Sequence, residues 1–325
     1  MNVKAVDIEE QKSIEGVQFP LVLTPEDQRA YSSDDFLTWM NGNQTRVREL
    51  MVKHGAILFR DFPIADADAF EAVLDAAEFV NMPYIGGAAP REQVTQGRIL
   101  TANESPPDQP IPFHHEMAQV PSLPAYVFFY CDIASETGGE TAIVHSNTVY
   151  KRFVAAGPEF AAKVEELGVK YIRVMPDQDD ASSPIGRSWR STFQASDRET
   201  AEAKMRELGT TWRWLDDGNL HTETAVVPAI RLDERSGMKT FFNSMVAAYT
   251  GWIDSRNIPE KAVVCGDGSP VNGDAVLETS RAMTEECVAF RWQQGDMLLI
   301  DNRLVMHSRR PYTGARRILA SIATG

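Results

Sequence analysis

Apolar and β-branched residues in this chain occur mostly in runs of about four to six positions, bounded by glycine, proline or charged residues. Runs of this length predict buried β-strands, because a helix needs a longer stretch with apolar residues at every third or fourth position. Many short strands joined by turns favour a double-sheet barrel with helices packed outside. The predicted strands are 55–60, 125–130, 224–227, 239–242, 288–292, 297–300 and 318–322.

Three segments have helical periodicity instead. In 68–77, the apolar residues from Phe70 onward follow the i, i+3, i+4, i+7 spacing of one helix face. The segment 158–167 begins with proline, which suits a first helical turn, and is followed by glycine, a common stop signal. A third helix is predicted after Ser196, where a Ser-x-x-Glu capping pattern occurs, and should end near Gly209.

We expect a single domain over residues 1–325. The chain is 43% hydrophobic, which is enough for one sizeable core. Residues 172–236 have the least regular pattern, and 177–183 are acidic and serine-rich, so we interpret 172–236 as an insertion or lid.

Composition limits the partners and the compartment. The net charge is −14, and an acidic surface repels phosphate backbones, which argues against nucleic-acid binding. No apolar run approaches the length of a membrane span, and the N-terminus lacks an apolar signal core. The three cysteines form no C-x-x-C pair, which fits a reducing, cytoplasmic location. The sequence leaves open whether the chain forms a homo-oligomer.

The candidate chemistry lies in the motif from His114 to Glu116, together with the distant His307. If 113–117 is extended, His114 and Glu116 share one face and His115 points away. Two imidazoles and one carboxylate can hold ferrous iron on one face and leave the other open for a bidentate 2-oxo acid and O₂. An isolated His-x-Glu often occurs by chance, so the motif becomes specific only beside further elements.

Those further elements form a family pattern. The run 55–60, the His-x-Glu motif, the Gly-Gly-Glu-Thr motif at 138–141, and the stretch 301–317 together resemble the TauD/TfdA family of iron(II)- and 2-oxoglutarate-dependent dioxygenases. The resemblance covers about residues 15–325. Glutamate, where the family usually has aspartate, is similar to the clavaminate synthase-type branch and to amino-acid hydroxylases that accompany nonribosomal peptide synthesis.

The resemblance implies a mainly β fold with flanking helices around a double-stranded β-helix, the jelly-roll or cupin-like core. It implies Fe(II), 2-oxoglutarate and O₂ as cofactors, and a bidentate arginine for the distal carboxylate of 2-oxoglutarate. We prefer Arg317 over Arg316, because Arg317 directly precedes the strand at 318. Arg309, Arg310 and Arg316 are otherwise interpreted as ordinary surface charge. The implied site residues are His114, Glu116 and His307 for iron, with Thr141 and Arg317 for 2-oxoglutarate.

The implied reaction is hydroxylation of an unactivated C–H bond, with release of succinate and CO₂. The expected small-molecule substrate is an amino acid or a derivative, free or presented on a carrier protein. Desaturation, epoxidation and cyclisation stay open, whereas halogenation is not expected, because related halogenases lack a carboxylate where this chain has Glu116. Candidate substrate contacts are Asn103, Glu104, His115, Asn243 and Arg303, although each also has a purely structural interpretation.

Two alternatives belong to other classes. A zinc hydrolase or deaminase would share the His-x-Glu motif, but the chain has neither the downstream P-C-x-x-C nor an H-E-x-x-H. A cupin-like protein that binds ligands without catalysis would be expected to have lost part of the ligand set.

Overall fold

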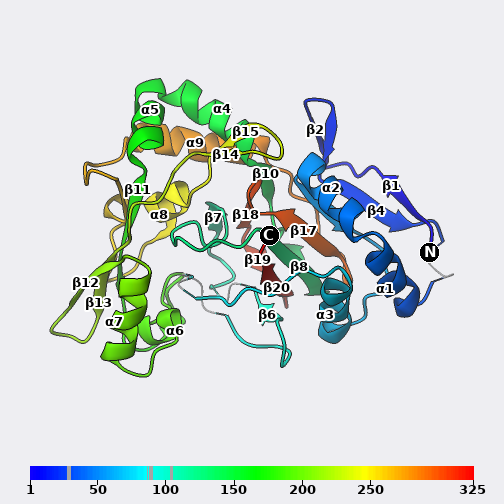
Figure 1. The fold of residues 1–325 in the computed structure, drawn as a ribbon, viewed down its shortest axis with the longest axis horizontal. Coiled ribbons are helices and arrows are strands. Elements are labelled where there is room, and N and C mark those ends of the chain that lie inside the picture. Colours follow the sequence, from blue (N-terminus) through cyan, green and yellow to red (C-terminus); the bar gives the residue numbers. More distant parts are fainter. Residues whose placement is uncertain (28–30, 86, 88–90, 103–104) are drawn as a thin grey trace.

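A seven-stranded sheet forms the main wall of the molecule in the computed structural model, which describes residues 1–27, 31–85, 87, 91–102 and 105–325. A three-stranded sheet lies against it, and apolar side chains of both sheets fill the space between them. This arrangement confirms the predicted double-stranded β-helix core with flanking helices (Figure 1). The large sheet has the order β1 (Val3–Val6), β4 (Leu21–Pro25), β5 (Ala56–Phe59), β17 (Met297–Asp301), β8 (Tyr126–Ile133), β20 (Arg317–Ala323) and β6 (Leu100–Thr101); the small one has β10 (Ile143–His145), β18 (Val305–Arg309) and β7 (Ile111–His114).

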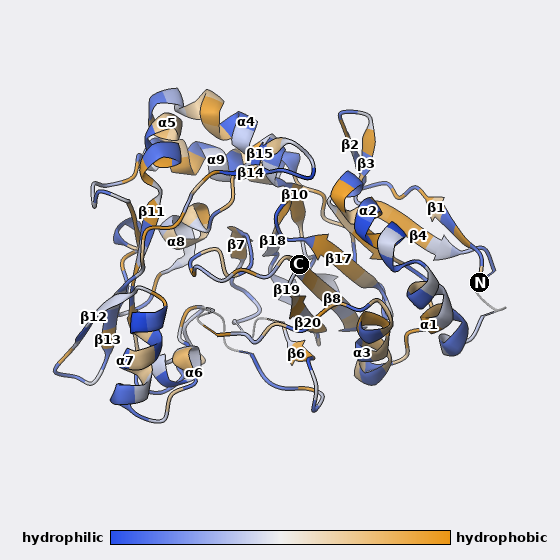
Figure 2. Cartoon of the chain, in the orientation of Figure 1, coloured by the Kyte–Doolittle hydropathy of each residue, from blue (hydrophilic) through white to orange (hydrophobic). Residues whose placement is uncertain are grey.

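The central strands are apolar along both faces because both faces are covered. Ile57 and Phe59 of β5 pack toward the helices, whereas Ala56 and Leu58 pack into the barrel. A strand buried on both sides needs no polar alternation, which explains the continuous apolar runs in the sequence. In Figure 2 the strands β8, β17 and β20 are accordingly coloured mainly as hydrophobic.

Three helices cover the outer face of the large sheet (Figure 1). They are α1 (Ser33–Gly42), α2 (Gln44–His54) and α3 (Ala67–Ala76). Ser32 caps α1 through a reciprocal capping box with Asp35, and Asp66 caps α3. The predicted helix at 68–77 is therefore confirmed, with its start one residue earlier.

Residues from 146 to 286 form a second layer beside the barrel (Figure 1). The predicted helix at 158–167 is confirmed, and the one after Ser196 begins at Arg198 with Asp197 as its cap. The interpreted insertion at 172–236 supplies most of a four-stranded sheet, to which a later strand is added. This layer contains α4 (Ser146–Ala156), α5 (Pro158–Leu167), β11 (Val169–Met175), α6 (Trp189–Phe193), α7 (Arg198–Glu207), β12 (Thr211–Trp214), β13 (Leu220–Glu223), α8 (Met245–Gly251), the 3₁₀ turn η1 (Pro259–Lys261), β16 (Val263–Cys265) and α9 (Gly273–Glu286).

Two of the predicted strands are wrong. Residues 224–227 and 288–292 are connecting segments, each with a single bridge, from Val227 to Val169 and from Val288 to Ile143. Val227, Val288, Phe290 and Trp292 are buried in these loops against the core, so burial explains most of the apolar pattern without a ladder, whereas Val226 is exposed. The predicted strand at 239–242 is present only in part. Three small two-stranded sheets complete the fold: β2 (Lys12–Ile14) with β3 (Val17–Phe19), β9 (Thr137–Gly138) with β19 (Tyr312–Thr313), and β14 (Arg231–Asp233) with β15 (Met238–Thr240).

Within the described ranges, none of the helices combines the length and the apolar character that a membrane crossing requires.

Candidate active site

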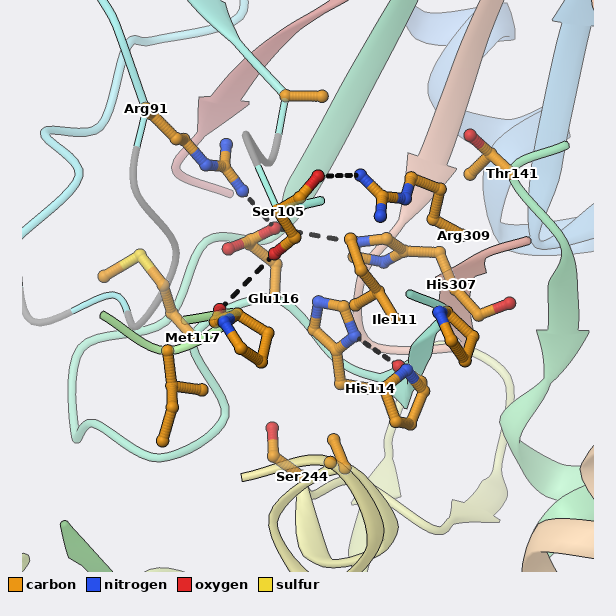
Figure 3. A pocket seen from close by; sticks show the side chains of 18 of the residues that line it. Arg91, Ser105, Ile111, His114, Glu116, Met117, Thr141, Ser244, His307 and Arg309 are labelled. Carbon is orange, nitrogen blue, oxygen red and sulfur yellow. Dashed lines mark hydrogen bonds and ion pairs between the residues drawn. The ribbon is translucent and has the colours of Figure 1, made fainter. Parts of the chain in front are cut away.

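Three potential metal ligands converge at one end of the small sheet. His114 ends β7 and lies directly opposite His307 of β18 in the antiparallel register, with ring centroids 4.4 Å apart. Glu116 Oε2 lies 3.6 Å from His307 Nε2. The donor atoms of all three residues lie within 4.8 Å of one another (Figure 3). Residues that are 193 positions apart in sequence thus form one compact group.

The way in which Glu116 reaches this group differs from the expected extended segment at 113–117. The strand ends at His114, and the chain turns through Glu116 to Met117, which has a positive φ of 55°. Asn302 holds this turn: its Oδ1 accepts the Glu116 N–H at 2.8 Å, and its Nδ2 donates to the Glu116 carbonyl at 3.1 Å. A side-chain amide, and not strand alternation, therefore brings Glu116 beside the histidines.

The protonation states suit a divalent metal. Burial, reinforced by the nearby His307 imidazole, lowers the pKa of His114 to about 4, so this ring is neutral at physiological pH. The contact between His114 Nδ1 and the Pro112 carbonyl, 2.9 Å, fixes this nitrogen as the donor and leaves Nε2 for a metal. Burial alone would raise the pKa of the Glu116 carboxyl, but the Arg91 guanidinium and the imidazoles hold it well below its ordinary value. A neutral imidazole and an ionised carboxylate are the forms that ligate.

Arg91 is a site residue that the sequence analysis missed. Its Nη2 donates to Glu116 Oε2 at 2.8 Å, and both side chains are buried. The guanidinium lies over the Tyr84 ring, 4.1 Å from its centroid. Arg91 lies in an irregular segment 25 residues before Glu116, and no motif in the sequence marks it.

The arginine that the sequence led us to expect at the cosubstrate, Arg317, does not line the pocket. Arg317 points outward, pairs with Asp132 at 3.1 Å, and has a side chain 47% exposed. Arg316 instead lines the pocket together with Thr141. Along β20, Ile318 and Ala320 face the barrel interior, so the two-residue alternation places Arg316 on the inner side. Arg316 is therefore the arginine that faces the pocket, and Arg317 faces away from it.

The Gly-Gly-Glu-Thr motif shapes the space for Arg316. Gly139 has a positive φ of 74°, and a Cβ there would lie 2.9 Å from Arg316 Cδ. The Gly139 carbonyl accepts a hydrogen bond from Arg316 Nε at 2.9 Å. Thr141 is buried, and its Oγ1 accepts a hydrogen bond from Trp292 Nε1 at 3.2 Å. Only glycine allows the close approach at 139 without strain.

Arg309 is buried in the same wall, so its interpretation as surface charge is wrong. Its guanidinium donates to the carbonyls of Ser105, Pro106 and Gln109 at 2.9, 2.6 and 2.7 Å. These bonds tie the loop at 105–109 to β18. The sequence did contain a signal, because Arg309 is two residues after His307 and therefore faces the same side of the strand.

The proposed substrate contacts are mostly structural. His115 is buried on the far side of the motif, where its Nδ1 meets the Asn302 carbonyl at 2.5 Å and its Nε2 meets Ser146 Oγ at 2.9 Å. Asn243 is buried and donates to the Ala229 carbonyl at 2.8 Å, while Arg303 pairs with Asp301 at 3.1 Å. These three residues lie outside the lining of the pocket. Asn103 and Glu104 fall outside the described residues.

A cavity of about 110 Å³ opens onto the three ligands. Ile111, Ile185, Ala247 and Trp252 contribute apolar wall from β7, from the loop before α6, and from α8. Arg91, Arg309 and Arg316 bring positive charge to the wall, and the described lining residues include one acid, Glu116. The cavity therefore combines an apolar body with cationic ends beside a metal-binding group.

A jelly-roll barrel that presents two histidines and one carboxylate to an open cavity defines the class of the non-heme metal oxygenases. The family model described as "Taurine catabolism dioxygenase TauD, TfdA family" matches residues 22–322, so the chain belongs to this family. The chain is accordingly a non-heme iron oxygenase that uses iron(II), 2-oxoglutarate and O₂.

Relatives cover nearly the whole chain. A clavaminate synthase-like protein of Arabidopsis thaliana is 49% identical over 319 residues, covering 97% of this chain and 96% of the relative. The dapdiamide synthesis protein DdaC of Enterobacter agglomerans is 24% identical over 287 residues, covering 85% and 84%. The solved structure of PvcB from Pseudomonas aeruginosa has a TM-score of 0.56 at 14% identity, covering 99% and 91%. A second structure describes PvcB as an Fe, α-ketoglutarate-dependent oxygenase from an isonitrile synthetic pathway.

Proposed function

We propose that this protein hydroxylates an unactivated C–H bond of an amino acid or an amino-acid-derived intermediate of natural-product biosynthesis. One oxygen atom of O₂ enters the substrate and the other enters succinate, while 2-oxoglutarate loses CO₂. The observation that carries the proposal is the position of the three ligands, whose common open side faces a cavity with apolar walls. An apolar wall next to the metal suits a substrate whose reacting carbon is part of a hydrocarbon chain.

The ligand set His114, Glu116 and His307 fits iron(II), since two imidazoles and one carboxylate form the facial arrangement of non-heme oxygenases. The iron and the 2-oxo acid supply the oxidising chemistry when bound. Asn302 and the Pro112 carbonyl orient two of the ligands from behind. The substrate's reacting bond must then lie on the open side of this group.

Arg316 and Thr141 are our candidates for binding the distal carboxylate of 2-oxoglutarate. Burial lowers the pKa of Arg316 to about 10, and the neighbouring Arg309 adds to this effect, so a bound anion would relieve a guanidinium that is costly to bury. A carboxylate that accepts from a guanidinium and a hydroxyl also aligns the 2-oxo group toward the ligands. These residues therefore bind and orient the cosubstrate.

The substrate class is supported by the relatives. DdaC is named for dapdiamide synthesis, and PvcB is described as an oxygenase of an isonitrile synthetic pathway, and both are biosynthetic settings. A carrier-bound aminoacyl group is the alternative form of the same substrate class. Retention of Glu116 favours transfer of oxygen over halogenation, because the carboxylate fills the site that a halide would need.

Succinate release tests this function. Amino acids and carrier-bound aminoacyl groups are incubated with the iron-loaded protein, 2-oxoglutarate and O₂, and the products are weighed by mass spectrometry. We expect substrate-dependent succinate and a product heavier by one oxygen atom, with both absent in His114→Ala. A product lighter by two hydrogen atoms would indicate that the reaction is desaturation or cyclisation and not hydroxylation. Succinate that stays at the substrate-free level with every compound in both sets would refute the proposed substrate class.

A further inference from the structure

Arg91 has more hydrogen-bonding capacity than its known contacts use. Its side chain is 6% exposed, and its Nη2 pairs with Glu116. Its Nε and Nη1 are buried and donate to no partner within the described ranges. Buried donors without an acceptor destabilise a fold, so such a group calls for an explanation. A guanidinium has five N–H groups and can keep Glu116 while it binds a second anion.

The segment that carries Arg91 is held firmly in place. Next to it, the Glu92 N–H donates to Thr101 Oγ1 at 2.9 Å, and the Thr101 N–H donates back to the Glu92 carbonyl at 2.8 Å. Thr101 belongs to β6, which pairs with β20 of the large sheet. The Tyr84 ring supports the guanidinium from one side. Arg91 is therefore fixed in advance, as a binding group should be.

Arg91 and the cosubstrate residues lie at different ends of the site. Figure 3 shows Arg91 and Thr141 on opposite sides of the three ligands. If the distal carboxylate of 2-oxoglutarate binds beside Thr141 and Arg316, as proposed above, the cosubstrate would extend from the three ligands away from Arg91. Arg91 consequently lies on the side where a substrate must bind.

Of the three arginines among the described lining residues, Arg91 is the one left to bind the substrate. Arg309 donates to three carbonyl groups, and Arg316 is our candidate partner for the cosubstrate. Glu116, the one acid among the lining residues that the structure describes, becomes a ligand when metal binds. The Glu116 charge that balances Arg91 would then be largely shared with the metal. A further anion beside Arg91 would balance the charge of the guanidinium again.

We propose that Arg91 binds the carboxylate of the substrate, so that this enzyme takes small carboxylic acids with an apolar body as free acids. The inference rests on the proposed function and makes it more specific. A thioester on a carrier protein lacks the carboxylate at this carbon, so the free acid, and not the carrier-bound form, is the substrate. The apolar residues Ile111, Ile185 and Trp252 would contact the rest of the molecule.

Binding can be measured without turnover. The protein is loaded with redox-inactive Mn(II) and the unreactive cosubstrate analogue N-oxalylglycine, and it is titrated calorimetrically with matched acids and primary amides. The panel runs from propanoate to octanoate and includes the corresponding 2-amino acids and their amides. We expect the best acid to bind about 10- to 100-fold more tightly than its amide, since a hydrogen bond to a charged group has about this effect. Equal affinities, or no binding by any acid, would overturn the proposal.

Arg91→Gln should abolish the preference for the acid, and Arg317→Gln, which removes an arginine that points outward, should retain it. Mn(II) and N-oxalylglycine affinities are measured in both variants. An unchanged acid-to-amide ratio in Arg91→Gln would show that Arg91 serves only Glu116 or the cosubstrate. If Arg91→Gln fails to take up Mn(II), a crystal structure of the loaded wild type with its best acid decides. A carboxylate within hydrogen-bond distance of Arg91 supports the proposal, and any other position refutes it.

The inference and the proposed function can fail separately. Amino acids that are oxidised while acids and amides bind equally well would leave the function intact and remove the role of Arg91. If acids bind through Arg91 but no amino acid or aminoacyl carrier gives succinate, the role of Arg91 would stand and the proposed function would fail.

Discussion

The two ends of the pocket are built from different kinds of structure. At the end proposed to bind the cosubstrate, His307, Arg309 and Arg316 lie on or directly beside strands β18 and β20, whose hydrogen-bonded ladders fix their direction. At the end proposed to bind the substrate, Arg91, Ile185 and Trp252 come from an irregular segment, a loop and the end of a helix. A strand determines where each side chain points, whereas a loop is positioned by contacts with distant parts of the chain.

This contrast matches a division of labour. Iron(II) and 2-oxoglutarate need one fixed geometry, which a rigid barrel can provide. The substrate differs from enzyme to enzyme, and loops tolerate the changes that a new substrate demands. Asn302 links the two ends, because it lies just after β17 and holds the turn that carries Glu116.

The largest effect is expected from Asn302→Ala. The change leaves the N–H and carbonyl of Glu116 and the carbonyl of Pro124 without their buried partner. We expect the free energy of unfolding to fall by about 3–5 kcal/mol and the affinity for Mn(II) to fall up to about 100-fold. Denaturant unfolding and calorimetry measure the two effects. Asn243→Ala removes another buried amide and should lower stability while metal affinity persists; equal metal loss in both variants would contradict the role of Asn302.

The second effect is a loss of the free energy of unfolding in acid, caused by a histidine in the small sheet. Burial lowers the pKa of His145, at the end of β10, to about 4 from an ordinary value of 6.5. The unfolded chain therefore binds a proton before the folded one does, so stability is full above pH 6.5, declines between pH 6.5 and 4, and is constant below. From this shift we expect a loss of about 3 kcal/mol across that window.

His145→Asn should remove this contribution of about 3 kcal/mol and leave those of the buried His114 and His115, whose pKa values are lowered in the same way. Denaturant unfolding at several pH values checks it, with His221→Gln as the control, because His221 on β13 is only half-buried and should contribute much less. An identical pH slope in wild type and His145→Asn would show that other groups cause the acid lability.

The sequence predicted the strands of the large sheet well, and the reason is physical. The runs that became β5, β8, β17 and β20 are apolar on both faces, and such runs are hard to place elsewhere than in a covered sheet. The ligands His114 and His307 could be found because the chemistry needs specific residue types. The run at 288–292 shows the limit, since a buried loop can be equally apolar.

The differences between expectation and structure at the site have one common cause. Whether Arg316 or Arg317 faces the pocket depends on which face of β20 points inward, and one residue of offset reverses the answer. The turn at Glu116 depends on Asn302, 186 residues away, and the Arg91 contact depends on how an irregular segment packs. Local patterns do not encode these long-range contacts, so the substrate end was largely missed.

A comparison of Arg316→Gln with Arg317→Gln would test directly which of the two arginines binds 2-oxoglutarate. Removing the half-buried Arg316 guanidinium should weaken 2-oxoglutarate binding about 10- to 100-fold, since a charge-assisted contact is lost. Removing Arg317 breaks an exposed ion pair and should change binding less than about 2-fold. Anaerobic titration of the iron-loaded protein with 2-oxoglutarate gives both values. A larger loss in Arg317→Gln would restore the original choice and require β20 to turn its other face inward.

The smallest effect is expected in the loop that bears Ile185. Asp180 pairs with Arg256 at 2.7 Å, and its side chain is 31% exposed. Asp180→Asn should lower global stability by less than about 1 kcal/mol, because partly exposed pairs contribute little. The loop itself should open more often, so limited proteolysis between 177 and 188 should accelerate while 2-oxoglutarate affinity is unchanged. Asp177→Asn, in the same loop but paired with Arg190, is the control. A parallel loss of 2-oxoglutarate affinity would mean that the two ends of the pocket are mechanically coupled and that their separation into a rigid wall and an adaptable one is too simple.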